Sequence, residues 1–168
     1  VCLACAFGIS TGQLTIPLYA LLSVFFLTFT GFADDLIEVR YREKLFLQLF
    51  AGVLMINSGY SIDSFHGVFY VYELPYWVEI IVSIFVFVVV VNALNLIDGL
   101  DGMASFISIK FFLIIGGIVL VSKTEWFIFF PIIISALLGF LWFNFNRNKK
   151  VFLGDTGSLF LGSIMAFF

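Results

Sequence analysis

The chain consists mainly of apolar runs separated by short polar segments. The runs predict helices, because their few polar members are small hydroxyl side chains that a helix in an apolar environment tolerates. An α-helix rises about 1.5 Å per residue, so roughly 20 such residues cross a bilayer. The residues before position 14 are predicted to be the end of a preceding helix and its turn. Helical spans are predicted at residues 14–32, 45–59, 77–96, 106–121, 126–143 and 158–168.

The segment between the second and third spans has a different pattern. Residues 60–76 show no helical period, and a short aromatic and β-branched run there follows Gly67 and ends before Pro75. Such a run, bounded by glycine and proline, favours strands and a turn. We therefore predict a small β-hairpin outside the membrane.

Composition narrows the class of protein. The chain is 62% hydrophobic and 11% charged, with 24 Phe among 168 residues. These values are typical of an integral membrane protein and far from a soluble average. The net charge is -3 and no basic patch is present, so a nucleic-acid partner is not expected. Cys2 and Cys5 lie in an apolar segment without a second pair or a nearby His, which favours packing over a metal or redox role.

The placement of the charges predicts the topology. Alternate threading of the spans puts the polar loops 33–44, 97–105 and 144–157 on one side of the membrane. Seven of the eight Lys and Arg residues lie on or near that side, and only Lys123 lies on the other. The positive-inside rule then makes that face cytoplasmic. We expect an all-α polytopic membrane protein with five to six transmembrane helices, cytoplasmic loops that carry the polar motifs and a small external β-hairpin.

The densest polar stretch is NALNLIDGLDGMA at residues 92–104. Asn92, Asn95 and Asp98 are three residues apart, so they can share one broad face of a helix. The glycines that follow each aspartate make a continued helix unfavourable. We predict a membrane helix that ends near Asp98, followed by a turn that directs Asp101 toward the same space.

Five aspartates stand at the ends of three spans on the predicted cytoplasmic face. Grouped carboxylates repel one another and raise one another's pKa unless a cation lies among them. Oxygen ligands without His or Cys suit Mg²⁺ or Mn²⁺ better than zinc. The alternative is that each acid is an ordinary solvated residue at a helix end, which is less persuasive for five acids in three motifs. The five are Asp34, Asp35, Asp98, Asp101 and Asp155.

The segment GDTGS at residues 154–158 adds a predicted phosphate site. Its glycines allow close backbone approach, and Thr156 or Ser158 is predicted to cap the following helix, whose N-H groups and positive dipole end would face the cytoplasm. Lys44 and the other basic residues of this face could contact a pyrophosphate. They could equally be topology anchors and lipid-headgroup contacts. A metal site beside hydrogen-bond donors for phosphate, at a membrane surface, predicts a phosphoryl-transfer reaction that involves a lipid.

Three motifs resemble a known superfamily. GFADD (31–35), NALNLIDGLDGMA (92–104) and VFLGDTGSLFLG (151–162) are similar to the cytoplasmic motifs of the polyprenyl-phosphate N-acetylhexosamine-1-phosphate transferases. These enzymes include bacterial undecaprenyl-phosphate GlcNAc-1-phosphate transferases and phospho-MurNAc-pentapeptide translocases. The short interval between Asp35 and Lys44, and Ile97 where the second branch usually has Thr, resemble the GlcNAc-1-phosphate branch.

The resemblance implies a magnesium-dependent exchange in a bacterial plasma membrane, with the active site on the cytoplasmic face. The phosphate of undecaprenyl phosphate attacks the β-phosphate of UDP-GlcNAc, and UMP leaves. The partners implied are the UDP-N-acetylhexosamine, undecaprenyl phosphate and the bilayer, and a homodimer is compatible with them. The implied catalytic residues are Asp34, Asp35, Asp98, Asp101 and Asp155; the substrate-binding residues are Lys44, Asn92, Asn95, Gly154 and Thr156; the metal ligands are Asp155, Asp34 and Asp35.

The chain also departs from that pattern. The superfamily has a His-bearing loop nearer its C-terminus and a Pro/Gly motif nearer its N-terminus, and neither matches here; His66 lies in the predicted hairpin. We therefore expect residues 1–168 to form one transmembrane catalytic domain that is the central part of a longer chain. The alternatives are MurNAc-pentapeptide transfer, an ion-coupled transporter and a non-catalytic scaffold. A transporter predicts ionisable residues near the middle of the spans, and the middle of each predicted span contains none.

Overall fold

The computed structural model describes residues 18–100, 102–122, 125–145 and 151–168. Within these residues the structure is helical, and each predicted span from residue 14 onward corresponds to a helix. The predicted helix end at residues 1–13 lies outside the described residues. The α-helices are α2 (Leu18–Ile37), α3 (Tyr41–Asn57), α4 (Tyr76–Ile97), α5 (Met103–Val121), α6 (Phe129–Asn144) and α7 (Gly154–Phe167); η1 (Val68–Tyr70) and η2 (Glu125–Ile128) are short 3-10 helices.

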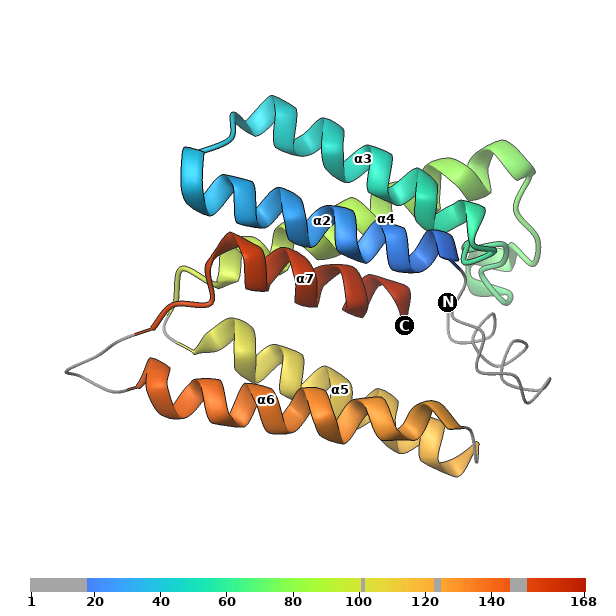
Figure 1. Ribbon diagram of the computed structural model, residues 1–168. Coiled ribbons are helices and arrows are strands. Elements are labelled where there is room, and N and C mark those ends of the chain that lie inside the picture. Colours follow the sequence, from blue (N-terminus) through green and yellow to red (C-terminus); the bar gives the residue numbers. More distant parts are fainter. Residues whose placement is uncertain (1–17, 101, 123–124, 146–150) are drawn as a thin grey trace.

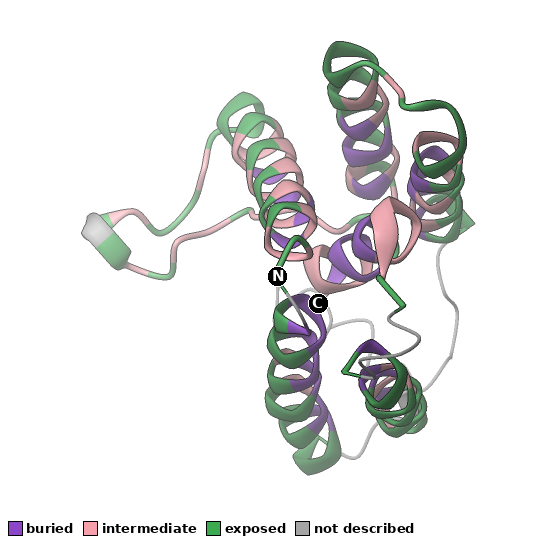
Figure 2. Cartoon of the chain, turned by 90° about the vertical axis from the view of Figure 1, so that its left-hand side faces the viewer, coloured by how far each residue is buried: buried purple, intermediate pink, exposed green. Residues whose placement is uncertain are grey.

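The helices have the surface of a membrane protein. By length and composition α2, α4 and α5 can each cross a bilayer, and α6 is a shorter apolar helix. Large apolar side chains such as those of Phe25, Phe85 and Leu113 are exposed. Figure 2 shows exposed residues on the outer faces of the helices and buried residues on the faces that meet inside the bundle. A continuous apolar exterior of this kind suits lipid rather than water. The expected class, an all-α polytopic membrane protein, is confirmed.

Helix α7 lies at the centre of the bundle. It packs mainly against α2 and α4, and α3 covers α2 and α4 on the other side (Figure 1). Leu27, Val91 and Leu159 are fully buried where α2, α4 and α7 meet. Helices α5 and α6 form a separate antiparallel pair, whose contact includes the buried rings of Phe112 and Phe130.

Three pairs of helix ends lie together at one end of the bundle. The C-terminal ends of α2, α4 and α6 and the N-terminal ends of α3, α5 and α7 all point the same way (Figure 1). This is the arrangement that alternate threading of the spans predicts. It brings the three aspartate-bearing motifs to one end of the molecule.

The predicted β-hairpin at residues 60–76 is wrong. The described residues of this connection contain no strand, and its tip is the 3-10 helix η1. The left-handed Gly67, with φ of 85°, starts this turn. The N-H groups of Val68, Tyr70 and Val71 bond to carbonyl groups within it, so they are not free for a ladder. Isolated bonds, such as Leu74 N-H to the Asp63 carbonyl at 2.8 Å, join the two arms instead.

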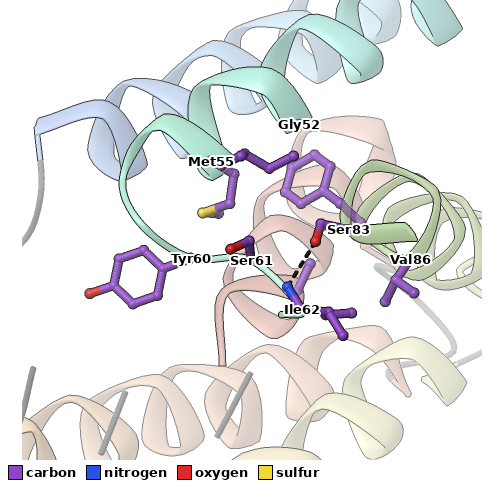
Figure 3. A pocket seen from close by; sticks show the side chains of 10 residues that line it. Gly52, Met55, Tyr60, Ser61, Ile62, Ser83 and Val86 are labelled. Carbon is purple, nitrogen blue, oxygen red and sulfur yellow. Dashed lines mark hydrogen bonds between the residues drawn. The ribbon is translucent and has the colours of Figure 1, made fainter. Parts of the chain in front are cut away.

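This connection is anchored to α4 at the end of the bundle opposite the aspartate motifs. The Ile62 N-H donates a hydrogen bond of 2.8 Å to Ser83 Oγ. Beside it, a cavity of about 20 Å³ is lined by Met55, Ser61 and Val86, among others (Figure 3). Such a cavity has room for about one water molecule. It is too small for a substrate and far along the helices from the acidic cluster.

Candidate active site

Lys44, in the first turn of α3, joins four helices at the end that carries the aspartates. Its Nζ donates to Asp34 Oδ2 on α2 at 2.7 Å and to Asp155 Oδ2 on α7 at 3.0 Å. Asn95 Oδ1 on α4 accepts a third, longer bond at 3.5 Å. Only 14% of the Lys44 side chain and 10% of the Asp34 side chain are exposed. Because water is largely excluded, these charges interact more strongly than a surface ion pair would.

The local charges keep Lys44 protonated. Burial by itself would lower the pKa of Lys44, but the hydrogen bonds and charges of Asp34 and Asp155 outweigh it and raise the pKa overall. The ammonium therefore stays positive and partly neutralises two carboxylates that would otherwise repel each other. It is a fixed positive charge at the centre of the acidic cluster.

Asp155, in the first turn of α7, is oriented by an amide. Asn95 Nδ2 donates to Asp155 Oδ1 and, at 2.8 Å, to Ser158 Oγ. Burial raises the pKa of the Asp155 carboxyl, and the neighbouring Asp34 adds to the rise, while Lys44 and Asn95 oppose it. About a third of the side chain remains exposed, at 33%. Asp155 is thus held on one side and open on the other.

Asp35 points elsewhere, although it is next to Asp34. Its Oδ1 accepts the backbone N-H of Asp155 at 2.8 Å, and its Oδ2 accepts the N-H of Thr156 at 3.0 Å. The Thr156 hydroxyl also donates to Oδ2, at 2.5 Å. A carboxylate from α2 therefore caps the N-terminus of α7, where free N-H groups and the helix dipole favour negative charge.

This cap corrects a prediction. Thr156 or Ser158 was expected to cap α7 and to leave its N-H groups facing the cytoplasm as a phosphate site. Instead α7 has no side-chain cap from Leu153, the residue before it, and the N-H groups of Asp155 and Thr156 are bonded to Asp35. The charged carboxylate is a stronger acceptor than a hydroxyl, which explains why it occupies these groups.

Gly31 allows this contact. A methyl group at position 31 would lie 2.4 Å from the carbonyl oxygen of Asp155 and 2.7 Å from the Cα of Thr156. Only glycine lets α2 approach α7 so closely. Asp35 follows one helical turn later, so it lies over the start of α7. Gly31 belongs to the GFADD motif but was not among the predicted site residues; the small residue one turn before Asp35 was the available signal.

Asp98 completes the contacts with the start of α7. It is the C-cap of α4, as predicted, and its carboxylate accepts a hydrogen bond from the backbone of Gly154. Burial raises the pKa of Asp98, and the nearby Asp155 and Asp35 add to the rise. Gly154 has φ of 70°, a left-handed conformation that glycine adopts without strain. Two carboxylates from two helices thus bind successive N-H groups of residues 154–156.

Asn92, which the sequence predicts to bind substrate together with Asn95, is bonded to α3 in the structure. Its Nδ2 donates to Gln48 Oε1 on α3 at 2.6 Å and to the Val88 carbonyl at 2.8 Å. Gln48 Nε2 donates back to Asn92 Oδ1 at 3.2 Å. Asp101 lies outside the described residues. The structure therefore brings together Asp34, Asp35, Lys44, Asn95, Asp98, Gly154, Asp155 and Thr156, and places Asn92 one turn deeper in the bundle.

The predicted magnesium site consists of the carboxylates of Asp34, Asp35 and Asp155. Within the described residues, no group of three or more Asp, Glu, His or Cys side chains is arranged to hold an ion. Asp34 is paired with Lys44, and Asp35 is bonded to α7. Mg²⁺ often takes only one or two carboxylates and completes its shell with water and substrate phosphates. The partly exposed Asp155 fits that mode, whereas a closed three-aspartate site does not fit this arrangement.

The fold and the site together define a class: a polytopic helical membrane protein with a lysine, several carboxylates and amides gathered at one end of its bundle. The chain belongs to glycosyl transferase family 4, whose model matches residues 17–168. This confirms the superfamily indicated by the three motifs.

Curated relatives agree with this membership. A probable undecaprenyl-phosphate N-acetylglucosaminyl 1-phosphate transferase of Bacillus subtilis is 32% identical over 95% of this chain and 47% of its own length. A phospho-N-acetylmuramoyl-pentapeptide-transferase of Streptococcus agalactiae is 39% identical over 81% of this chain and 44% of its own length. A Streptococcus thermophilus protein of the same name is 37% identical over 81% and 43%. The chain spans less than half the length of these relatives.

Proposed function

We propose that the full-length protein transfers N-acetylglucosamine 1-phosphate from UDP-GlcNAc to undecaprenyl phosphate. A phosphate oxygen of the lipid forms a bond to the β-phosphorus of the nucleotide sugar. The bond from that phosphorus to the bridging oxygen breaks, and UMP leaves with the oxygen. The products are undecaprenyl-pyrophosphoryl-GlcNAc and UMP.

The observation that carries this proposal is the convergence of three motifs on Lys44 and Asp155. Phosphoryl transfer depends mainly on positioning and on neutralising negative charge. Lys44 supplies a fixed positive charge 3.0 Å from the carboxylate of Asp155. Asn95 fixes the orientation of that carboxylate. Among the described residues, Lys44 is the cation in contact with these carboxylates, so we propose that it contacts the phosphate groups of the substrate.

A divalent cation such as Mg²⁺, or Mn²⁺ in its place, is part of the proposal. When bound, it would offset charge on the pyrophosphate. Asp155 is the residue placed to hold it, and Asp34 could join if Lys44 turned to the substrate. Asp35 and Asp98 serve mainly to position α7, since their oxygens bond to its first N-H groups.

The donor is proposed as UDP-GlcNAc on two observations. The relative named for that activity aligns with 95% of this chain, against 81% for the pentapeptide transferases. The short interval from Asp35 to Lys44 resembles the same branch. Transfer of phospho-MurNAc-pentapeptide is the second candidate, because two relatives with that name are 39% and 37% identical to this chain. We further propose that the site faces the cytoplasm, since Arg40, Arg42 and Lys44 lie at the start of α3, at the same end of the bundle as the site (Figure 1).

The test measures UMP release from membranes that contain the full-length protein, with Mg²⁺, undecaprenyl phosphate and either UDP-GlcNAc or UDP-MurNAc-pentapeptide. We expect release with UDP-GlcNAc, its loss in Asp155→Ala, and its retention in Asp63→Ala, a matched change of an exposed aspartate in the α3–α4 connection. Release only with the pentapeptide donor would favour the second candidate. No release with either donor from folded protein would contradict the proposal.

A further inference from the structure

Gln48 on α3 and Asn92 on α4 form a reciprocal amide pair. Asn92 Nδ2 donates to Gln48 Oε1 at 2.6 Å, and Gln48 Nε2 donates to Asn92 Oδ1 at 3.2 Å. Gln48 is fully buried, with 0% of its surface exposed. An unpaired amide would be unfavourable in such surroundings, and here each amide satisfies the other.

The pair lies directly below the site on both helices. Gln48 follows Lys44 by four residues on α3, and Asn92 precedes Asn95 by three on α4, so each pair of residues shares one helix face. Lys44 and Asn95 are themselves in contact, with Nζ 3.5 Å from Oδ1. The α3–α4 seam thus carries two adjacent polar contacts, one at the site and one a turn deeper.

Other contacts of this seam are less directional. One turn beyond Gln48, Gly52 faces the Phe87 ring, and a methyl group at position 52 would lie 3.3 Å from Phe87 Cδ1. Apolar contacts of this kind are non-directional, so they restrict the rotation of one helix against the other less strictly than hydrogen bonds do. Two amides that donate to each other are satisfied in only one relative arrangement.

We propose that Gln48 and Asn92 are positioning residues for the transfer reaction. Their pairing sets the register of α3 against α4, so that Lys44 and Asn95 meet Asp155 together. Neither residue touches the acidic cluster; both act through the residue on the next turn. The catalytic consequence rests on the proposed function, while the register itself is a property of the fold that can be measured without activity.

The first arm of the test replaces both amides. In Gln48→Leu/Asn92→Leu two leucines fill the same space, and removing both partners of a hydrogen bond can leave stability nearly unchanged. We expect a thermal midpoint like that of the wild type, kcat for UMP release lowered at least tenfold, and KM for the nucleotide sugar changed by less than threefold. The exchanged pair, Gln48→Asn/Asn92→Gln, restores two amides and should recover part of kcat. Phe46→Leu/Val89→Leu, at exposed positions on the same two helices, is the matched control.

A purely structural pair would give a different result. If the pair only held the helices together, the double leucine variant, once folded, would keep the wild-type kcat. That outcome, or failure of the exchanged pair to exceed the double leucine variant, would overturn the proposal.

The second arm does not depend on activity. The native cysteines of the full-length protein are first replaced by serine. Lys44→Cys/Asn95→Cys then places one thiol on α3 and one on α4, and crosslinking by a short bismaleimide measures how close the two thiols are. We expect the yield of intramolecular crosslink to fall at least threefold when Gln48→Leu/Asn92→Leu is added, and not with the Phe46 and Val89 control. An unchanged yield overturns the proposal. A wild-type protein that releases no UMP contradicts the proposed function, and the crosslink then still decides whether the pair sets the register.

Discussion

Two parts of the bundle are assembled differently. Helices α2, α3, α4 and α7 are joined at one end by directional polar contacts, among them Lys44 to Asp155 and Asp35 to the start of α7. The α5–α6 pair packs through rings, with the Phe112 and Phe130 centroids 6.3 Å apart, and through Gly116, whose added methyl would lie 3.0 Å from Phe130 Cβ. In a bilayer, apolar contacts between helices gain little from leaving lipid, so shape alone decides them. This difference predicts that the transfer reaction depends on the polar contacts among α2, α3, α4 and α7. The α5–α6 pair is expected to contribute mainly to stability.

The largest effect is expected from Asp155→Asn. The change keeps the shape of the side chain but removes the charge that pairs with Lys44 and receives the Asn95 amide. Removing one group that stabilises charge in a preorganised site typically costs about 10²–10³ in rate. UMP release should fall by at least that factor, while elution on size exclusion stays that of the wild type. If the variant kept more than a tenth of the wild-type rate of UMP release, Asp155 would not be essential to the transfer reaction.

The next effect is expected from Gly31→Ala. Its methyl group would lie 2.4 Å from the Asp155 carbonyl oxygen, so α2 must move away from α7. Overpacking of this kind typically costs about 1–3 kcal/mol of stability. We expect a lower thermal midpoint and about a tenfold to hundredfold loss of UMP release.

Gly139→Ala on α6 is the matched control for Gly31→Ala, because nothing lies within 4 Å of a methyl group there. Alanine at that position should leave UMP release unchanged, and should leave the thermal midpoint unchanged or raise it slightly, since alanine favours the helix. Equal behaviour of the two variants would mean that α2 and α7 are not in close contact.

A smaller effect is expected from Asp35→Asn. The amide can accept one of the two N-H groups that the carboxylate accepts now, and it carries no charge for the helix dipole. We expect a stability loss of about 1–2 kcal/mol, as for other lost caps, and about a tenfold loss of UMP release. Chemical denaturation and the UMP assay measure the two. Complete loss of activity without loss of stability would instead indicate that Asp35 takes part in the chemistry.

The smallest effect on activity is expected from Phe112→Ala in the α5–α6 pair. Phe112 is fully buried against Phe130, so its loss leaves a cavity that costs about 3–5 kcal/mol in a soluble core and less within lipid. The thermal midpoint should fall clearly, while kcat per folded molecule stays within about twofold. A tenfold loss of kcat in the folded fraction would show that the α5–α6 pair contributes to the site as directly as the polar contacts do.

The helices and their arrangement could be predicted from the sequence to a large extent. Apolar runs of bilayer length leave the backbone little choice but helix, and alternate crossing then brings the three aspartate motifs to one end. The same reasoning failed at residues 60–76, where an aromatic run after Gly67 suggested strands. There a local 3-10 turn takes the N-H groups that a hairpin ladder would need.

The sequence by itself therefore determined the helical membrane class, the family and most of the described residues that gather at the site. Only the tertiary structure decided which partner each residue has. Asp34 and Asp35 are adjacent in the sequence, yet about 100° apart around α2, so one meets Lys44 and the other meets α7. Asn92 and Asn95 share a face of α4 but lie at different depths, so Gln48 takes the first and Asp155 the second. Such partners depend on how far each helix is rotated and how closely it approaches its neighbours, and no pattern within a single helix contains that information.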